Sequence, residues 1–171
     1  MDPGSLFYLS VILGFVGFGL ITRWYLMPAL SALPLERSLR PLLLLHSFRF
    51  IGLAFAVPGV VSPDLPSSFA NPAAYGDLLA ALLALVSLAA LRFRWALALP
   101  LVWLFNLEGT LDLLYAFFQG FRSQVHPGYF GAMYFVPTVV VPALITTHVI
   151  IFRLLLQSKK SEIIRTSSGH Q

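Results

Sequence analysis

The chain has 171 residues, of which 58% are hydrophobic and 11% are charged, and its mean hydropathy is +0.83. Soluble domains carry about 25% charged residues, so this composition excludes an ordinary soluble globule and a disordered chain. The formal net charge is only +4, and the basic residues flank apolar runs, which argues against a nucleic-acid-binding protein. There is no cysteine, so disulfides, thiolate metal sites and cysteine nucleophiles are excluded.

Five apolar segments are long enough to cross a membrane, since a transmembrane helix needs about 20 mostly apolar residues. The sequence therefore predicts an all-α, polytopic membrane protein, a compact bundle of five transmembrane helices in a single domain over residues 1–156. A loose, polar cytoplasmic tail is expected over residues 157–171. The first segment is interpreted as an uncleaved helix, because its basic residue follows the apolar run. The predicted spans are residues 6–22, 41–61, 72–91, 96–118 and 130–155.

The basic residues predict the orientation of this bundle, because cytoplasmic loops carry an excess of Arg and Lys. With the N-terminus outside and the C-terminus cytoplasmic, nine of the 11 basic residues fall on cytoplasmic pieces. Arg122 lies outside, and Arg49 lies within a span. The expected location is the plasma membrane, or the inner membrane of a bacterium. The cytoplasmic set is Arg23, Arg37, Arg40, Arg92, Arg94, Arg153, Lys159, Lys160 and Arg165.

Glycine and proline positions predict helix ends, packing and kinks. Asn71 followed by Pro72 is a helix-start signal. Gly14, Gly17 and Gly19 give the first helix a thin side, which predicts close packing against another helix or a second copy of the chain. Prolines inside a span remove a backbone donor and kink the helix. Those expected within spans are Pro58, Pro137 and Pro142.

Six ionisable residues lie inside the predicted spans, where a charge costs about 2.5–3.5 kcal/mol at the helix centre and marks a functional candidate. A rise of about 1.5 Å per residue sorts them into three layers. Two histidines lie toward the cytoplasm, Arg49 and Glu108 lie near the middle as depth-matched partners, and two aspartates lie toward the outside. The six residues are His46, Arg49, Asp77, Glu108, Asp112 and His148, and Asn106 adds neutral polarity near the middle.

The fourth predicted helix is polar on two sides, which predicts a place in the bundle interior. Glu108 and Asp112 are four residues apart and share one stripe, whereas Asn106 and Gly109 lie on another side. A purely structural alternative stays open, because an Arg–Glu pair can serve only to fix helix register. Asp77, near the start of its helix, can simply favour the positive end of the helix dipole.

The first functional hypothesis is a small ligand or cofactor bound at an intramembrane polar site. Its residues would be His46, Arg49, Asn106, Glu108 and His148. The sharpest version is a b-type haem held by the two histidines, because imidazole is a good axial ligand and bundle cores commonly hold cofactors. A metal ion held by the same histidines and a carboxylate is a variant of this hypothesis.

The alternative is proton- or cation-coupled transport along Asp77, Glu108 and Asp112. Five helices make a small transporter, so a homo-oligomer is expected in that case. An accessory membrane subunit and a lipid-active membrane enzyme are further alternatives. No nucleophile or metal-binding motif indicates catalytic residues, which stay unassigned. The expected partners are the lipid bilayer, the ligand or cofactor and a second copy of the chain, and no nucleic acid.

Overall fold

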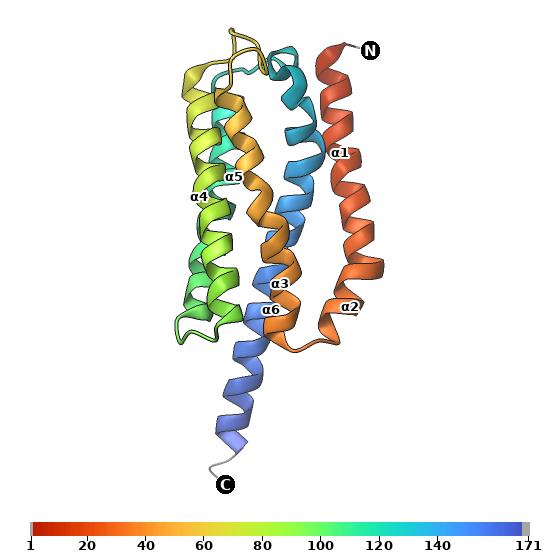
Figure 1. Cartoon of the computed structure of the whole chain (residues 1–171). Helices are drawn as coiled ribbons and strands as arrows, with labels where there is room; N and C mark the ends of the chain where they lie inside the picture. The colour runs from red at the N-terminus through yellow and green to blue at the C-terminus, as the bar shows by residue number, and fades with distance from the viewer. Residues whose placement is uncertain (1, 169–171) are drawn as a thin grey trace.

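The structure is a computed structural model that describes residues 2–168, with side chains described through residue 158. Five helices in it are long and apolar enough to cross a membrane, and they stand side by side (Figure 1). The described residues form no strand. The all-helical fold and the number of long helices are therefore confirmed. The five helices cover Pro3–Ser31, Leu35–Ala56, Ser67–Arg92, Ala98–Arg122 and Val136–Ser158.

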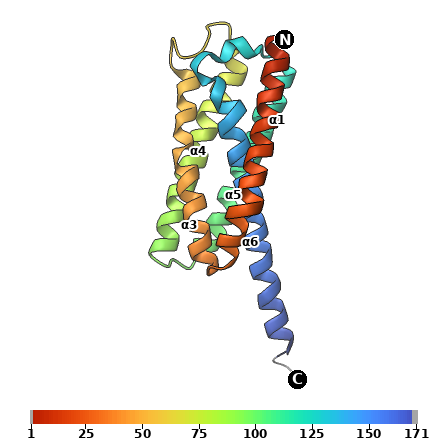
Figure 2. The same cartoon turned by 90° about the vertical axis from the view of Figure 1, so that its right-hand side faces the viewer.

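The two ends of the bundle differ in their connections. The N-terminus lies at the same end as the connections 57–66 and 123–126, and we refer to this as the N-terminal end. At the opposite end, α6 (Val141–Ser168) extends past the other helices (Figures 1 and 2). Residues 157–168 of the predicted polar tail are thus helical, and residues 169–171 lie outside the described residues. No Pro or Gly occurs in α6 after Pro142, so the sequence has no signal that would end the helix earlier.

The first long helix lies at the edge of the bundle. Asp2 caps α1 (Pro3–Ile21) by accepting hydrogen bonds from the Ser5 backbone N–H at 2.8 Å and the Ser5 hydroxyl at 2.7 Å. These two bonds lower the pKa of the Asp2 carboxyl below its ordinary value. None of the residues of α1 is buried. The helix is therefore attached to the bundle over a smaller surface than the other four.

Gly14 lies where α1 packs closely against the beginning of the fifth span. A Cβ atom at Gly14 would overlap the Thr138 carbonyl oxygen and lie 3.0 Å from Pro142 Cγ. A Cβ atom at Gly17 or Gly19 would meet nothing within 4 Å. Within the chain, the prediction of close packing through small residues is therefore confirmed at Gly14, whereas packing against a second copy stays a prediction.

Two π-helical segments occur just before prolines. One is η1 (Thr22–Leu26), which joins α1 to α2 (Met27–Ser31) and precedes Pro28. The other is η4 (Val136–Val140), which precedes Pro142 of α6. A proline has no N–H for the carbonyl four residues earlier, and its ring clashes with that carbonyl. The wider π turn moves the carbonyl aside, so each helix continues past its proline.

The second span changes its winding halfway. It begins with α3 (Leu35–His46) and continues as the 3₁₀ helix η2 (Ser47–Ala56). A 3₁₀ helix rises about 2.0 Å per residue, so ten such residues extend the span by about 20 Å. The predicted bounds of 41–61 are shifted, because Pro41 lies inside α3. Pro58 lies beyond Ala56, where the second span ends, so the predicted kink at Pro58 does not occur in this helix.

The third span, α4 (Ser67–Arg92), begins earlier than predicted. Pro72 lies inside it, so the helix start predicted from Asn71 and Pro72 is wrong. Pro72 leaves the carbonyl of Ser68, four residues earlier, without its helical donor. The Gln119 side chain of α5 (Ala98–Arg122) donates to that oxygen at 3.3 Å. A neighbouring helix thus supplies what the proline removes, which the local sequence could not indicate.

Two buried apolar clusters occupy the two ends of the bundle, and the buried residues His46, Arg49, Asp77 and His148 lie between them. The cluster at the N-terminal end includes residues of η2, α4 and the 3₁₀ segment η3 (Pro127–Tyr134). The cluster at the other end fills the space between α3, α4, α5 and α6. Its members that are at most 1% exposed are Leu39, Leu43, Ala84, Ala90, Leu91, Val102, Phe105, Ile150 and Ile151.

Candidate functional site

Arg49 reaches the bundle interior because of the 3₁₀ winding. With three residues per turn, residues three apart lie on the same face. His46, Arg49, Gly52 and Phe55 have this spacing, and all four are buried. Arg49 is only 3% exposed. His46 and Arg49 therefore share one face, as predicted. The 3₁₀ winding continues this face along η2 as far as Phe55, which belongs to the apolar cluster at the N-terminal end.

The Arg49 guanidinium binds two carboxylates at once. Its Nε atom donates to Asp77 Oδ1 at 2.7 Å, and its Nη2 atom donates to Asp112 Oδ2 at 2.5 Å. Its Nη1 atom donates to the Gly109 carbonyl at 3.2 Å. The Arg49 side chain is 0% exposed, and each carboxylate side chain is 12% exposed. One charged side chain thus joins η2, α4 and α5 through charge-assisted hydrogen bonds.

Glu108 does not pair with Arg49, so the predicted depth-matched pair is wrong. Its side chain lies in a shallow groove of α5 with Leu107, Leu111 and Tyr115. Its Oε2 atom is buried without a hydrogen-bond partner in the described part of the chain. An α-helix turns about 100° per residue, so Asp112 lies about 40° nearer the buried face than Glu108 does. Depth alone could not reveal this difference in rotation.

Three glycines that the sequence did not single out as site residues make room for this network. A Cβ atom at Gly52 would overlap the Asp77 carboxylate, and one at Gly76 would overlap the Asp112 carboxylate. A Cβ atom at Gly109 would lie 2.7 Å from Arg49 Nη1 and 2.7 Å from an atom of the His148 ring. Glycine inside a helix costs about 1 kcal/mol relative to alanine. A glycine next to an acid inside a predicted span was therefore the sequence feature that could have indicated these site residues. Gly76 precedes Asp77, and Gly109 follows Glu108.

His148 continues the network away from the acids. Its Nε2 atom lies 3.4 Å from Arg49 Nη1, and its Nδ1 atom lies 2.7 Å from Asn106 Oδ1. Because arginine can only donate, Nε2 is the acceptor, and the Nδ1–H group donates to Asn106. The Asn106 amide donates in turn to the His148 backbone carbonyl at 3.3 Å. The hydrogen bonds thereby assign a neutral His148 with its proton on Nδ1.

His46 lies against His148 and has one unused nitrogen. Its Nε2 atom lies 3.0 Å from Thr147 Oγ1, whose own proton is used for carbonyls of its helix, so Nε2–H is the donor. Its Nδ1 atom is buried and has no hydrogen-bond partner among the side chains through residue 158 or the described backbone. The two imidazole rings are 4.2 Å apart between centroids, and the Phe105 ring packs against both.

This arrangement does not fit a haem held by His46 and His148. Two axial ligands bind the iron from opposite faces of the macrocycle, which must therefore lie between them. Here the two rings are in direct contact, and both are fully buried. Within the described residues, no group of three or more His, Asp or Glu side chains could hold a metal ion. The contact between the two rings leaves no space for a macrocycle between them, and the haem and metal versions of the hypothesis find no support.

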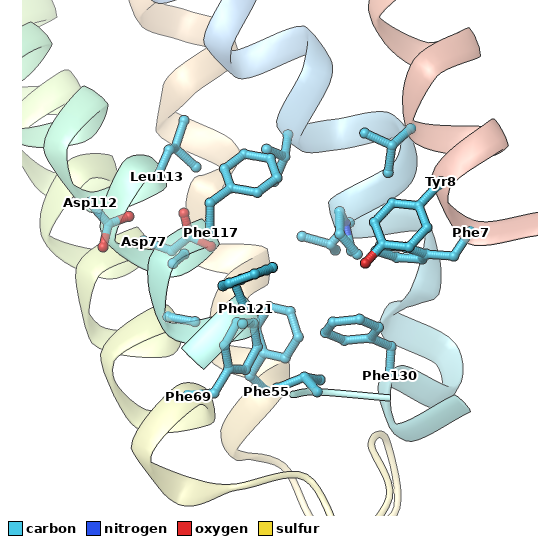
Figure 3. Close-up of a pocket in the computed structure, with 18 residues that line it drawn as sticks. Phe7, Tyr8, Phe55, Phe69, Asp77, Asp112, Leu113, Phe117, Phe121 and Phe130 are labelled. Atoms are coloured by element: carbon cyan, nitrogen blue, oxygen red, sulfur yellow. The ribbon is translucent and has the colours of Figure 1, made fainter. Parts of the chain in front are cut away.

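A pocket lies instead on the other side of the acids, toward the N-terminal end. Its volume is about 210 Å³, and both Asp77 and Asp112 line it. Its walls are otherwise almost entirely apolar. Figure 3 shows the aromatic side chains gathered around it and the two carboxylates at one side. The aromatic residues that line it are Phe7, Tyr8, Phe55, Phe69, Phe117, Phe121 and Phe130.

The aromatic walls differ in burial. Phe55, Phe69 and Phe130 are buried and pack edge to face, with centroids 5.8 to 6.3 Å apart. Tyr8 of α1 and Phe121 of α5 are 65% and 85% exposed. The pocket therefore has a fixed aromatic base and opens between α1 and α5. Sequence reasoning missed it, because its walls come from five helices and no local pattern joins them.

The fold and the site define a helical bundle of membrane type with a buried arginine–carboxylate network beside an aromatic pocket. Residues 6–156 match a family described as "Domain of unknown function (DUF8737)", and the chain belongs to this family. No curated protein and no solved structure matches the chain. The matched range contains all the residues of the network and of the pocket.

The two histidines are expected to differ in their contribution to stability. His148→Phe removes the hydrogen-bond partner of the Asn106 side-chain oxygen and of one Arg49 N–H group. Each unsatisfied group should lower the free energy of unfolding by about 1–3 kcal/mol. His46→Phe removes one hydrogen bond and also removes an unpartnered nitrogen, so it should cost about 1 kcal/mol or less. Thermal unfolding in detergent, followed by tryptophan fluorescence, measures both. Equal melting temperatures for the two variants would contradict the assigned network.

Proposed function

We propose that the protein is a multi-pass membrane protein that binds a small, largely apolar molecule in the aromatic pocket beside Asp77 and Asp112. The observation that carries the proposal is a pocket with apolar walls and two convergent charged groups, which is the usual composition of small-molecule sites. The inner wall is well organised for this purpose. Arg49 fixes both carboxylates, and Gly52 and Gly76 let them approach closely.

The site differs from the one expected from the sequence. Asp77 and Asp112 border the ligand, and Arg49 lies behind them as the residue that positions them. His148 contacts Arg49 from the far side and is itself held by Asn106, and neither residue lines the pocket. Glu108 lies in the groove outside. The residues proposed to bind the ligand are therefore the two aspartates and the aromatic walls.

Analysis of co-purified molecules tests this proposal. Ala116 lines the pocket, so Ala116→Phe fills it without touching the ion pairs. Leu111→Phe adds the same ring to the exposed face of α5 and serves as the matched control. Protein purified from native membranes is extracted and analysed by mass spectrometry. A compound present in the unmodified protein and in Leu111→Phe but lost from Ala116→Phe supports the pocket, and identical extracts from all three oppose it.

We further propose a plasma-membrane location with the N-terminus outside and the C-terminus in the cytoplasm, based on the asymmetry of the basic residues. Because the chain contains no cysteine, single introduced cysteines report the orientation directly. Ser123→Cys, in the connection 123–126, should react with a membrane-impermeant maleimide in intact cells. Ala32→Cys, in the connection 32–34, should react only after lysis. The reverse pattern would reject this orientation.

A second candidate function is proton- or cation-coupled transport. The supporting observation is that Asp77 and Asp112 share a single cation, Arg49, and that Glu108 lines the groove next to Asp112, so the region has an excess of acid groups. The apolar cluster below the histidines closes the far end, so transport would need a second conformation. Proteoliposomes containing a pH-sensitive dye test this candidate. Flux that Asp112→Asn abolishes supports it, and the absence of flux under every imposed gradient opposes it.

A further inference from the structure

We propose that the ligand of the aromatic pocket is a small lipophilic monocation, such as an amine or quaternary ammonium attached to one hydrocarbon ring. This inference rests on the proposed function, because it names the class of molecule that the pocket binds. Three features of the pocket carry it: the charge on its inner wall, the aromatic rings around it, and the way the carboxylate oxygens are already used.

The charge on the inner wall favours a cation. Asp77 and Asp112 share the one positive charge of Arg49, which leaves a net charge of −1 when both are ionised. Arg49 is itself 0% exposed and does not line the pocket. No Lys, Arg or His is among the residues that line it. A monocation would bring the local charge to zero, whereas an anion would meet two carboxylates without access to the arginine.

The aromatic rings favour the same class of ligand. Seven rings line a pocket of about 210 Å³, and the face of an aromatic ring attracts cations. This attraction is strongest where water is excluded. Phe55, Phe69 and Phe130 are each at most 7% exposed and form such an environment at the base. The volume is below the usual range of about 300–1,000 Å³ for drug-sized ligands, so the ligand is small.

The contacts of the Asp77 and Asp112 oxygens indicate that the ligand is recognised by its charge and not by a directed hydrogen bond. One oxygen of each carboxylate accepts from Arg49. The second oxygen of Asp77 lies against Gly52, and the second oxygen of Asp112 lies against Gly76. The backbone of the two glycines therefore restricts the directions from which a neutral donor could approach these oxygens. A positive charge is attracted without a directed hydrogen bond, because electrostatic attraction acts over several ångströms in an apolar setting.

Three probes of similar size test the inference on the purified chain in lipid nanodiscs. Benzyltrimethylammonium is the cation, neopentylbenzene is its neutral isostere, and benzenesulfonate is an anion. Binding is measured by equilibrium dialysis, with empty nanodiscs subtracted. We expect the cation to bind at least tenfold more tightly than the neutral isostere, and the anion not to bind. Ala116→Phe should abolish cation binding.

Variants of the acids separate charge from shape. Asp112→Asn should weaken cation binding at least tenfold and leave the neutral isostere within twofold, whereas Glu36→Gln, an exposed acid far from the pocket, should change neither. If the two isosteres bind equally and Ala116→Phe blocks both, the pocket stands and the cationic class is overturned. If no probe binds and Ala116→Phe changes no co-purified compound, the proposed function itself fails.

Discussion

Replacing Arg49 with methionine is expected to lower the free energy of unfolding by about 3–5 kcal/mol, because it leaves two buried carboxylates without their cation. Asp77 and Asp112 would then face each other across the space that the guanidinium occupies. Denaturant-induced unfolding in detergent micelles, followed by tryptophan fluorescence, measures the loss. Arg49→Lys should recover only part of it, since an ammonium group cannot donate to both carboxylates with the fork geometry of a guanidinium.

A charge-balanced variant distinguishes pairing from simple loss of packing. Arg49→Met combined with Asp77→Asn and Asp112→Asn removes the buried charges together and should recover most of the lost stability. Glu108→Gln serves as the comparison, because Glu108 has no ion pair with Arg49, and it should change stability by less than about 1 kcal/mol. If Glu108→Gln destabilised the protein as much as Asp112→Asn, the pairing of Arg49 with the two aspartates would be incorrect.

Gly109→Ala is expected to cost about 2–4 kcal/mol, although it adds a single methyl group. The new Cβ would lie 2.7 Å from Arg49 Nη1 and 2.8 Å from His148 Nε2. Both side chains would have to move, so the hydrogen bonds that join α5 to η2 and α6 would lengthen or break. The melting temperature of the purified variant in detergent gives the result.

Gly17→Ala is the matched control for this prediction. A Cβ atom there meets nothing within 4 Å, and alanine is favoured over glycine inside a helix by about 1 kcal/mol. The control should therefore melt at or above the temperature of the unmodified protein. If Gly109→Ala behaved like Gly17→Ala, the close approach of α5 to Arg49 would be wrong.

Rotation about the helix axis explains why the site was only partly predictable. Spacing of three correctly placed His46 and Arg49 on one face, and depth correctly grouped the two histidines and the two aspartates. Depth wrongly paired Arg49 with Glu108, because a residue's height along a helix does not fix the direction in which its side chain points. The pocket escaped prediction because Phe69 and Phe130 are brought together only by helix packing.

The order of apolar residues along the chain determined that it is helical and has five helices able to cross a membrane, because apolar length is a local property that packing does not alter. It also determined that a few polar groups would have to find partners inside the bundle. Which partners they find was decided by the tertiary structure. The 3₁₀ winding of η2 aligns Arg49 with Gly52, and the glycines of three neighbouring segments admit the side chains opposite them. Such matches depend on the distance between two helices, which neither helix encodes by itself.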